Sequence, residues 1–178
     1  MTSERTVRGS TVALILCAAA LSAGCGTDEK KEYAVPGSLC GVKVSARLLS
    51  PLLPPGKSVK LDREDTLLNH GNIHCNVIVD GKTVFIATQT WRDRGNSALS
   101  MAMIQPEMEP EILHGGWHFQ YSEKGAAMRV DCRTPKKPGR DLFAIPRIPG
   151  PQKPDVADVK AFTKNYAKGV AQSDQCRR

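Results

Sequence analysis

The stretch CNVIVDGKTVFIATQTW, residues 75–91, decides the fold. Residues of high β-propensity stand on both sides of Asp80 and Gly81, a pair typical of a two-residue type I′ turn. The sequence therefore predicts an antiparallel hairpin, whose facing pairs are Val79–Lys82, Val77–Val84 and Cys75–Ile86. The side chains expected on its core face are Cys75, Val77, Val84 and Ile86.

The stretch GGWHFQYSEKGAAMRVDCRT, residues 115–134, repeats this design. We expect residues 122–125 to form its turn. The alternating apolar side chains of the two strands are Trp117, Phe119 and Tyr121 on the first and Met128, Val130 and Cys132 on the second. The segment between the hairpins, residues 96–113, is ambiguous, and we interpret it as a further strand followed by a loop bounded by prolines. Shorter strands are expected at residues 57–61 and 141–145.

Helical patterns frame these strands at both ends of the domain. Near its start, Ser45 can cap a short helix, and Ser50 can cap a second one with Pro51 in its first turn. Near its end, Asp155 can cap a helix whose apolar stripe is Val159, Phe162, Tyr166 and Val170. The order of elements predicts an α+β fold. We expect an antiparallel sheet built from hairpins, with the short N-terminal helical segment and the C-terminal helix packed on one face.

A leader precedes the domain. Arg5 and Arg8 lie before an apolar run at residues 11–21, and small side chains follow the run. This order is typical of a secretory signal peptide. The run is too short for a membrane-spanning helix, which needs ~20 residues.

The end of the leader carries a cysteine. The sequence Leu21-Ser22-Ala23-Gly24-Cys25 resembles the bacterial lipobox, in which the cysteine receives a diacylglyceryl group before cleavage. The alternative is an ordinary cleavage site with an unrelated cysteine nearby. We expect a signal peptide at residues 1–24, a tether at 25–34 held on the outer face of the cell membrane through lipidated Cys25, and one extracytoplasmic α+β domain at 35–178.

Four cysteines remain in the domain: Cys40, Cys75, Cys132 and Cys176. An even number outside the cytoplasm favours two disulfides. Cys75 and Cys132 are in phase with the core faces of their strands, whereas Cys40 begins the first helical segment and Cys176 ends the last one. We therefore predict the pairs Cys40–Cys75 and Cys132–Cys176, each fastening a helical segment to a core strand. The alternative pairs, Cys75–Cys132 and Cys40–Cys176, would staple the hairpins together and join the ends of the domain.

The chain is basic, with 25 Lys and Arg against 18 Asp and Glu. The connector at residues 133–154 concentrates this charge in Arg133, Lys136, Lys137, Arg140, Arg147 and Lys153. An exported protein is expected to meet no nucleic acid. The candidate partners are anionic lipid headgroups, an anionic cell-wall polymer or an envelope protein. A basic surface without a partner is the alternative.

Four histidines are the candidate metal ligands. His70 and His74 are four residues apart, as are His114 and His118, but glycines lie inside both pairs, so neither pair is expected on a helix. Histidines on loops and on the sheet surface are the default expectation. Serine-nucleophile motifs are absent from the sequence, and no cofactor is expected.

Several segments together carry a family resemblance: VPGSLCGVKV…LLSPLLPPGK, CNVIVDGK…W, GG…YSEKGAAMRVDC and FTKNYAKGVAQSDQC. They resemble a group of secreted or lipid-anchored proteins of high-GC Gram-positive (actinobacterial) bacteria, over residues 35–176. The resemblance implies a location outside the cytoplasm and a disulfide pattern, and it transfers no catalytic residue. The preferred hypothesis is a non-enzymatic surface lipoprotein that acts as a binding or interaction module. The alternative is a metal-dependent or hydrolytic envelope enzyme that uses His70, His74, His114 and His118.

Overall fold

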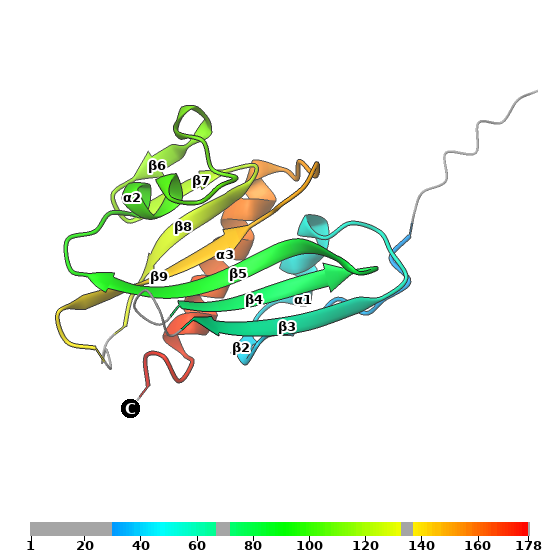
Figure 1. The fold of residues 1–178 in the computed structure, drawn as a ribbon, viewed down its shortest axis with the longest axis horizontal. Coiled ribbons are helices and arrows are strands. Elements are labelled where there is room, and N and C mark those ends of the chain that lie inside the picture. Colours follow the sequence, from blue (N-terminus) through cyan, green and yellow to red (C-terminus); the bar gives the residue numbers. More distant parts are fainter. Residues whose placement is uncertain (1–29, 67–71, 133–136, 178) are drawn as a thin grey trace, which may run out of the picture.

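The computed structural model describes residues 30–66, 72–132 and 137–177. One antiparallel sheet of seven strands, in the order β3-β4-β5-β9-β8-β7-β6, forms the centre of the molecule (Figure 1). Its strands are β3 (Val59–Thr66), β4 (Asn72–Val79), β5 (Lys82–Asp93), β6 (His114–Gly116), β7 (Phe119–Ser122), β8 (Gly125–Val130) and β9 (Arg140–Arg147). The helical elements are α1 (Ala46–Leu49), η1 (Ser50–Leu52), α2 (Ala98–Met103), η2 (Pro110–Ile112) and α3 (Val156–Ala171), and β1 (Ser38–Leu39) and β2 (Val42–Lys43) form a separate small hairpin. The predicted α+β class is confirmed.

The hairpin that opens the sequence analysis is present as β4 and β5, but its register changes along its length. Val79 faces Lys82 as predicted, whereas Val77 faces Phe85 and Cys75 faces Ala87. The predicted pairs Val77–Val84 and Cys75–Ile86 are therefore wrong. The cause is a β-bulge between Val77 and Ile78, which accommodates one extra residue on β5 and moves every later side chain of β5 to the other face.

The bulge brings a large aromatic ring into the core. Val84 and Phe85 are both buried, and Ile86 is left half-buried on the opposite side of the sheet. The ring of Phe85 meets the ring of Phe162 from α3 edge to face, with 5.2 Å between their centroids. A regular hairpin would have pointed Phe85 away from α3.

The second predicted hairpin is present as β7 and β8, joined by a turn at the predicted place, with Ser122 facing Gly125. Phe119 and Met128 face each other across it and pack against the main core. Trp117 is an exception to the predicted alternation, because it lies in the turn between β6 and β7 and is 59% exposed.

The segment before this hairpin contains a helix, so the predicted strand at residues 96–113 is wrong. Ser97 and Ser100 form a capping box: the Ser97 hydroxyl accepts the Ser100 N–H at 3.1 Å, and the Ser100 hydroxyl accepts the Ser97 N–H at 3.2 Å. The buried side chains of the helix, α2, have helical spacing; they are Ala98, Met101 and Ala102. They pack on Ala127, Phe143 and Ile145 in a second core cluster.

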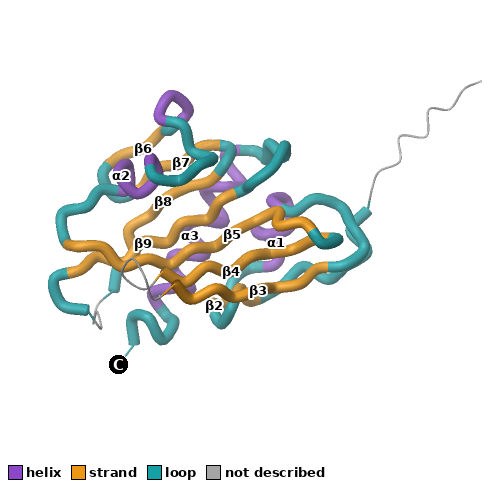
Figure 2. Tube along the Cα trace, in the orientation of Figure 1, coloured by secondary structure: helices purple, strands orange, loops and turns teal. Residues whose placement is uncertain are grey.

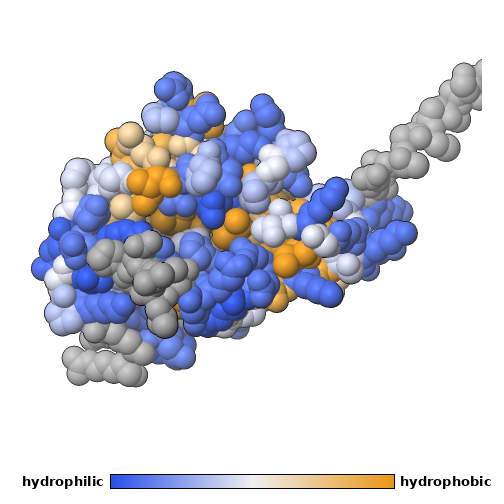
Figure 3. All heavy atoms as spheres, in the orientation of Figure 1, coloured by the Kyte–Doolittle hydropathy of each residue, from blue (hydrophilic) through white to orange (hydrophobic). Residues whose placement is uncertain are grey.

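Helix α2 and helix α3 cover opposite faces of the sheet (Figure 2). The core side chains of β9 accordingly alternate, with Leu142 and Ala144 in the α3 cluster and Phe143 and Ile145 in the α2 cluster. Around α2, the outward apolar side chains Leu99, Met103 and Ile104 remain exposed and form the hydrophobic area at the upper left of Figure 3.

Helix α3 forms as predicted. The Asp155 carboxylate accepts the Ala157 N–H at 2.7 Å and caps the helix. The four residues of the predicted stripe, Val159, Phe162, Tyr166 and Val170, are all fully buried. At the start of the domain, α1 begins after Ser45, whose N–H donates to Asn165 Oδ1 of α3 at 2.8 Å, but the Ser45 side chain makes no capping hydrogen bond. The predicted Ser50 cap is wrong, because Ser50 is the first residue of the 3₁₀ helix η1 and Leu49 holds the cap position, while Pro51 lies in the first turn as predicted. The two short predicted strands are present in longer form as β3 and β9.

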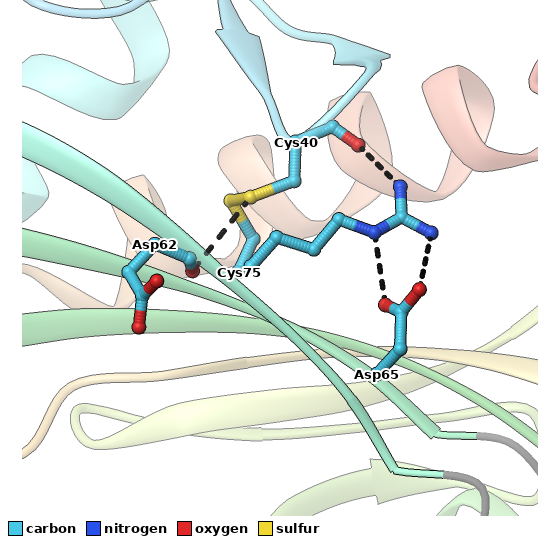
Figure 4. A network of polar contacts seen from close by, with 5 residues as sticks. Cys40, Asp62, Asp65 and Cys75 are labelled. Carbon is cyan, nitrogen blue, oxygen red and sulfur yellow. Dashed lines mark hydrogen bonds and ion pairs between the residues drawn. A yellow bond between two sulfur atoms is a disulfide. The ribbon is translucent and has the colours of Figure 1, made fainter.

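Both predicted disulfides are present, Cys40–Cys75 and Cys132–Cys176, with Cα–Cα distances of 5.7 and 5.2 Å. Cys40 lies in the turn between β1 and β2, so the first disulfide fastens this small hairpin to β4, and not a helix as we expected (Figure 4). Arg63 of β3 supports the junction, since its guanidinium binds both carboxylate oxygens of Asp65 and donates to the Cys40 carbonyl at 3.4 Å.

The disulfides indicate an oxidising environment outside the cytoplasm. Within the described residues, no helix is both long and apolar enough to span a membrane.

Candidate anion-binding groove

Of the candidate histidines that the structure describes, His74 lies far from the other two, His114 and His118. His74 lies on β4, where its Nδ1 is 2.8 Å from Thr88 Oγ1, while His114 lies on β6 and His118 in the turn that follows it. Five strand spacings separate β4 from β6, or about 24 Å. The ranges that the structure describes contain no group of three or more His, Cys, Asp or Glu side chains that could hold a metal ion. His70 and Cys25 lie outside the described residues.

His74 is the histidine with the most distinctive environment. Burial against β5 lowers its pKa, the positive charge of Arg147 lowers it further, and Glu64 opposes both effects. The imidazole is therefore held in its neutral form in a row of polar side chains on the sheet. Its ring is bonded to the Thr88 hydroxyl, and Glu64 is its neighbour across the pair of strands β3 and β4.

The basic connector does not form one charged surface in its described part. Arg140 pairs with Asp93 at 3.5 Å, Arg147 with Glu107 at 2.8 Å and Lys153 with Glu123 at 3.3 Å. Each of these three cations is thus paired with a carboxylate from another segment. Arg133 and Lys136 lie outside the described residues.

A different basic surface is present between α3 and β8. A groove of about 650 Å³ runs between them, and four cations line it: Arg129, Lys164, Lys168 and Arg177. Asp131 is the one carboxylate among its lining residues. Its remaining described lining is Met128, Ala167, Ala171, Gln172 and Cys176. The groove therefore combines an excess of three positive charges with an apolar floor.

The spacing of lysines on α3 explains this charge. Lys160, Lys164 and Lys168 recur every four residues, so their side chains share one face of the helix, while the predicted apolar stripe faces the sheet. The small side chains of Ala167 and Ala171 lie between the lysines and β8 and leave the space open.

The cations of the groove are weakly neutralised. Within the described chain, Lys164, Lys168 and Arg177 have no carboxylate within ion-pair distance, and Arg129 reaches Asp141 only at 3.7 Å. Lys160, just outside the groove, lies over the ring of Tyr121, 4.6 Å from its centroid. Like charges four residues apart on a helix destabilise it by about 0.2–0.5 kcal/mol per pair. Lys168 lies in the last turn, where the helix dipole favours a cation, whereas Lys160 and Lys164 gain nothing from it, and a bound anion would relieve the repulsion along the row.

The groove offers charged and apolar groups to a ligand. Its described lining contains four cations, the carboxylate of Asp131, one amide and apolar side chains. The sequence analysis did not predict this basic surface, because it considered only the apolar side chains of α3. The lysine repeat in KAFTKNYAK was the available signal, whereas the approach of Arg129 requires the packing of β8 on α3.

No protein-family model, curated protein or solved structure matches this chain.

Proposed function

We propose that this protein is a non-enzymatic lipoprotein of the outer cell surface that binds an anionic envelope ligand through the α3–β8 groove. In this proposal residues 1–24 direct export, Cys25 carries the lipid, and residues 25–34 tether the domain. The observation that carries the binding function is the row of four cations along the groove, of which Lys164, Lys168 and Arg177 have no carboxylate partner among the described residues and Arg129 has one at 3.7 Å.

Other features support the same proposal. Two disulfides fit an exported protein, and outside the cytoplasm anionic lipids and wall polymers are the abundant polyanions. The separation of His74 from His114 and His118 argues against the alternative of a metal-dependent or hydrolytic enzyme. The proposal also includes the resemblance to lipid-anchored proteins of actinobacteria. That resemblance rests on the cysteines, the turns and the terminal helix, which are structural features.

The anchor is tested by the substitution Cys25→Ser. We expect the variant to lose metabolic labelling with a radioactive fatty acid and to appear in the culture fluid or to remain unprocessed. Cell fractionation measures the distribution. A cleaved, unlabelled variant that stays in the membrane fraction would overturn the lipid anchor.

The groove is tested with tripolyphosphate as the probe and calorimetry as the measurement. Replacing three groove cations (K164Q, K168Q and R177Q together) should weaken binding about tenfold, because each exposed ion pair contributes about 0.2–1 kcal/mol. The matched control replaces three exposed cations elsewhere (R47Q, K60Q and K82Q together) and changes the net charge equally. Equal losses in the two variants would show a net-charge effect and would contradict a groove-specific site.

A further inference from the structure

A second hollow lies next to the groove. It has a volume of about 330 Å³ and lies where β5 and β8 end and β9 begins, with Arg94, Arg140 and His118 among its lining residues. Arg129 and Asp131 line both the hollow and the groove. The disulfide between Cys132 and Cys176 joins them, because Cys132 lines the hollow and Cys176 lines the groove.

The two hollows together carry an excess of positive charge. Their lining cations are Arg94, Arg129, Arg140, Lys164, Lys168 and Arg177, against Asp131 and Asp141. Two of these cations are in ion pairs: Arg129 with Asp141 of the lining at 3.7 Å, and Arg140 with Asp93, which lies outside the lining, at 3.5 Å. Each guanidinium has five N–H donors, so most of them remain free for a ligand.

We infer that the ligand of the groove, on the function proposed above, is a linear polyanion with an anionic group at each repeat, and that it occupies the groove and the second hollow at once. A compact anion would need one hollow only. Because Arg129 and Asp131 line both hollows, the hollows adjoin at the end of β8, and a chain that occupies both passes beside the Arg129 cation. Binding in both hollows makes the second contact intramolecular and raises the affinity of a long chain over that of a short one.

The position of the hollows favours a wall polymer over the protein's own membrane. The N-terminal segment joins the domain at Lys31, which bridges to Gly56 beside the turn at Asp80. Arg94 follows the other end of β5, whose twelve residues span about 40 Å at most. In Figure 1 the first described residues and the C-terminal end lie towards opposite ends of the long axis.

The tether is short compared with this distance. The six residues from Cys25 to Lys31 reach about 21 Å when fully extended. For Arg94 and Arg140 to contact the lipid headgroups, the domain would have to be inverted, and the tether would then have to span the length of β5. That length exceeds the reach of the tether. With its tether on the membrane, the domain presents the second hollow outward, where an anionic polymer of the wall lies.

Calorimetry with the full mature chain in neutral detergent tests this inference with two probes, tripolyphosphate and long-chain polyphosphate. We expect the long chain to bind at least tenfold more tightly per molecule. The variant R94Q/R140Q should lose about tenfold in affinity for the long chain and stay within twofold of wild type for tripolyphosphate. The variant K164Q/K168Q should weaken both, and K60Q/K82Q, the matched control, neither.

The outcomes separate the inference from the function on which it rests. If R94Q/R140Q binds the long chain as wild type does, the ligand is compact and the inference fails, while the groove remains a binding site. If K164Q/K168Q leaves tripolyphosphate binding unchanged, the proposed function fails. A third arm uses phosphatidylglycerol vesicles, with phosphatidylcholine vesicles as the control. The wild type could bind these vesicles, lose that binding in both the groove and the hollow variants, and show no preference for longer polyphosphate. This outcome would assign the surface to the membrane and overturn the inference of a polymer ligand.

Discussion

Replacing Phe162 with alanine should destabilise the protein more than any change of an exposed aromatic residue. Phe162 is fully buried on α3, its ring lies 5.2 Å from that of Phe85 in an edge-on contact, and it stacks on Tyr166 at 5.9 Å. A buried phenylalanine truncated to alanine costs about 3–5 kcal/mol, because the lost burial is accompanied by a cavity. We expect about 4 kcal/mol, since α3 carries a disulfide near its end and cannot collapse freely into the space.

Urea unfolding followed by far-UV circular dichroism measures this difference. For a chain of this length the loss corresponds to a fall in Tm of about 8–16 °C, at roughly 2–4 °C per kcal/mol. The variant F162L keeps most of the volume and should cost under about 1.5 kcal/mol. The matched control is W117A, which removes a larger ring that is 59% exposed, and it should stay within about 0.5 kcal/mol of wild type. A cost below about 1.5 kcal/mol for F162A, or equal costs for F162A and W117A, would refute the packing of α3 on the bulged strand.

Three further predictions concern the fold. Removing the second disulfide with C132S/C176S should lower the free energy of unfolding by about 4 kcal/mol in the chain-entropy treatment, given a sequence separation of 44. Peptide mapping of this variant under non-reducing conditions should still find Cys40 linked to Cys75. The Asp80 carboxylate accepts the backbone N–H groups of residues 57–58, and these hydrogen bonds lower its pKa below the ordinary value of 3.8. The carboxylate therefore stabilises the fold fully above pH 3.8, and this contribution is lost as the pH falls through the lowered pKa. The stability difference between wild type and D80N, measured by urea unfolding, should therefore shrink below about pH 4, and a constant difference down to pH 2 would contradict the role of this carboxylate. Replacing Gly169 with alanine should destabilise the protein by about 1–2 kcal/mol in thermal unfolding despite the better helix propensity of alanine, because its Cβ would lie 2.4 Å from a carbonyl oxygen of β2, and a more stable variant would disprove this contact.

Much of the fold follows from local patterns in the sequence. The stripe on α3 and its Asp155 cap were readable because a helix repeats every 3.6 residues and a capping side chain acts over two or three residues. The disulfide pairs were readable because Cys75 and Cys132 are in phase with buried side chains of their strands. In each case the information lies within one or two elements.

The errors arise where neighbours across the sheet decide the structure. The bulge in β5 is favoured by the contact of Phe85 with Phe162, and these residues are far apart in the sequence. Helix α2 has only six residues, and its apolar side chains suit a strand as well as a helix. Its capping box at Ser97 was the local signal that separates the two.

The candidate groove was only half readable from sequence. The lysines of α3 have a visible repeat, and the predicted disulfide places Arg177 near Cys132. The position of Arg129 beside them depends on the end of β7 and the packing of β8 on α3, which no local pattern encodes. In the connector, carboxylates such as Glu107 approach the cations only in the folded chain, so the sequence does not reveal these ion pairs.

The two disulfides also determine how the molecule transmits mechanical force. A pull that enters through the tether and leaves through a polymer held near Cys132 passes along the backbone to Cys40, crosses the first sulfur link to Cys75, and continues to Cys132. The loop that contains β3 lies outside this covalent path, whereas α3, inside the other loop, would be loaded only through a ligand held by Lys164 and Lys168. If the proposed function holds and the protein is pulled between membrane and wall, its backbone would therefore lengthen by a limited amount, set by the segment from Cys75 to Cys132. The two disulfides limit how far the rest of the domain can extend, so the segment can refold on it when the force ceases.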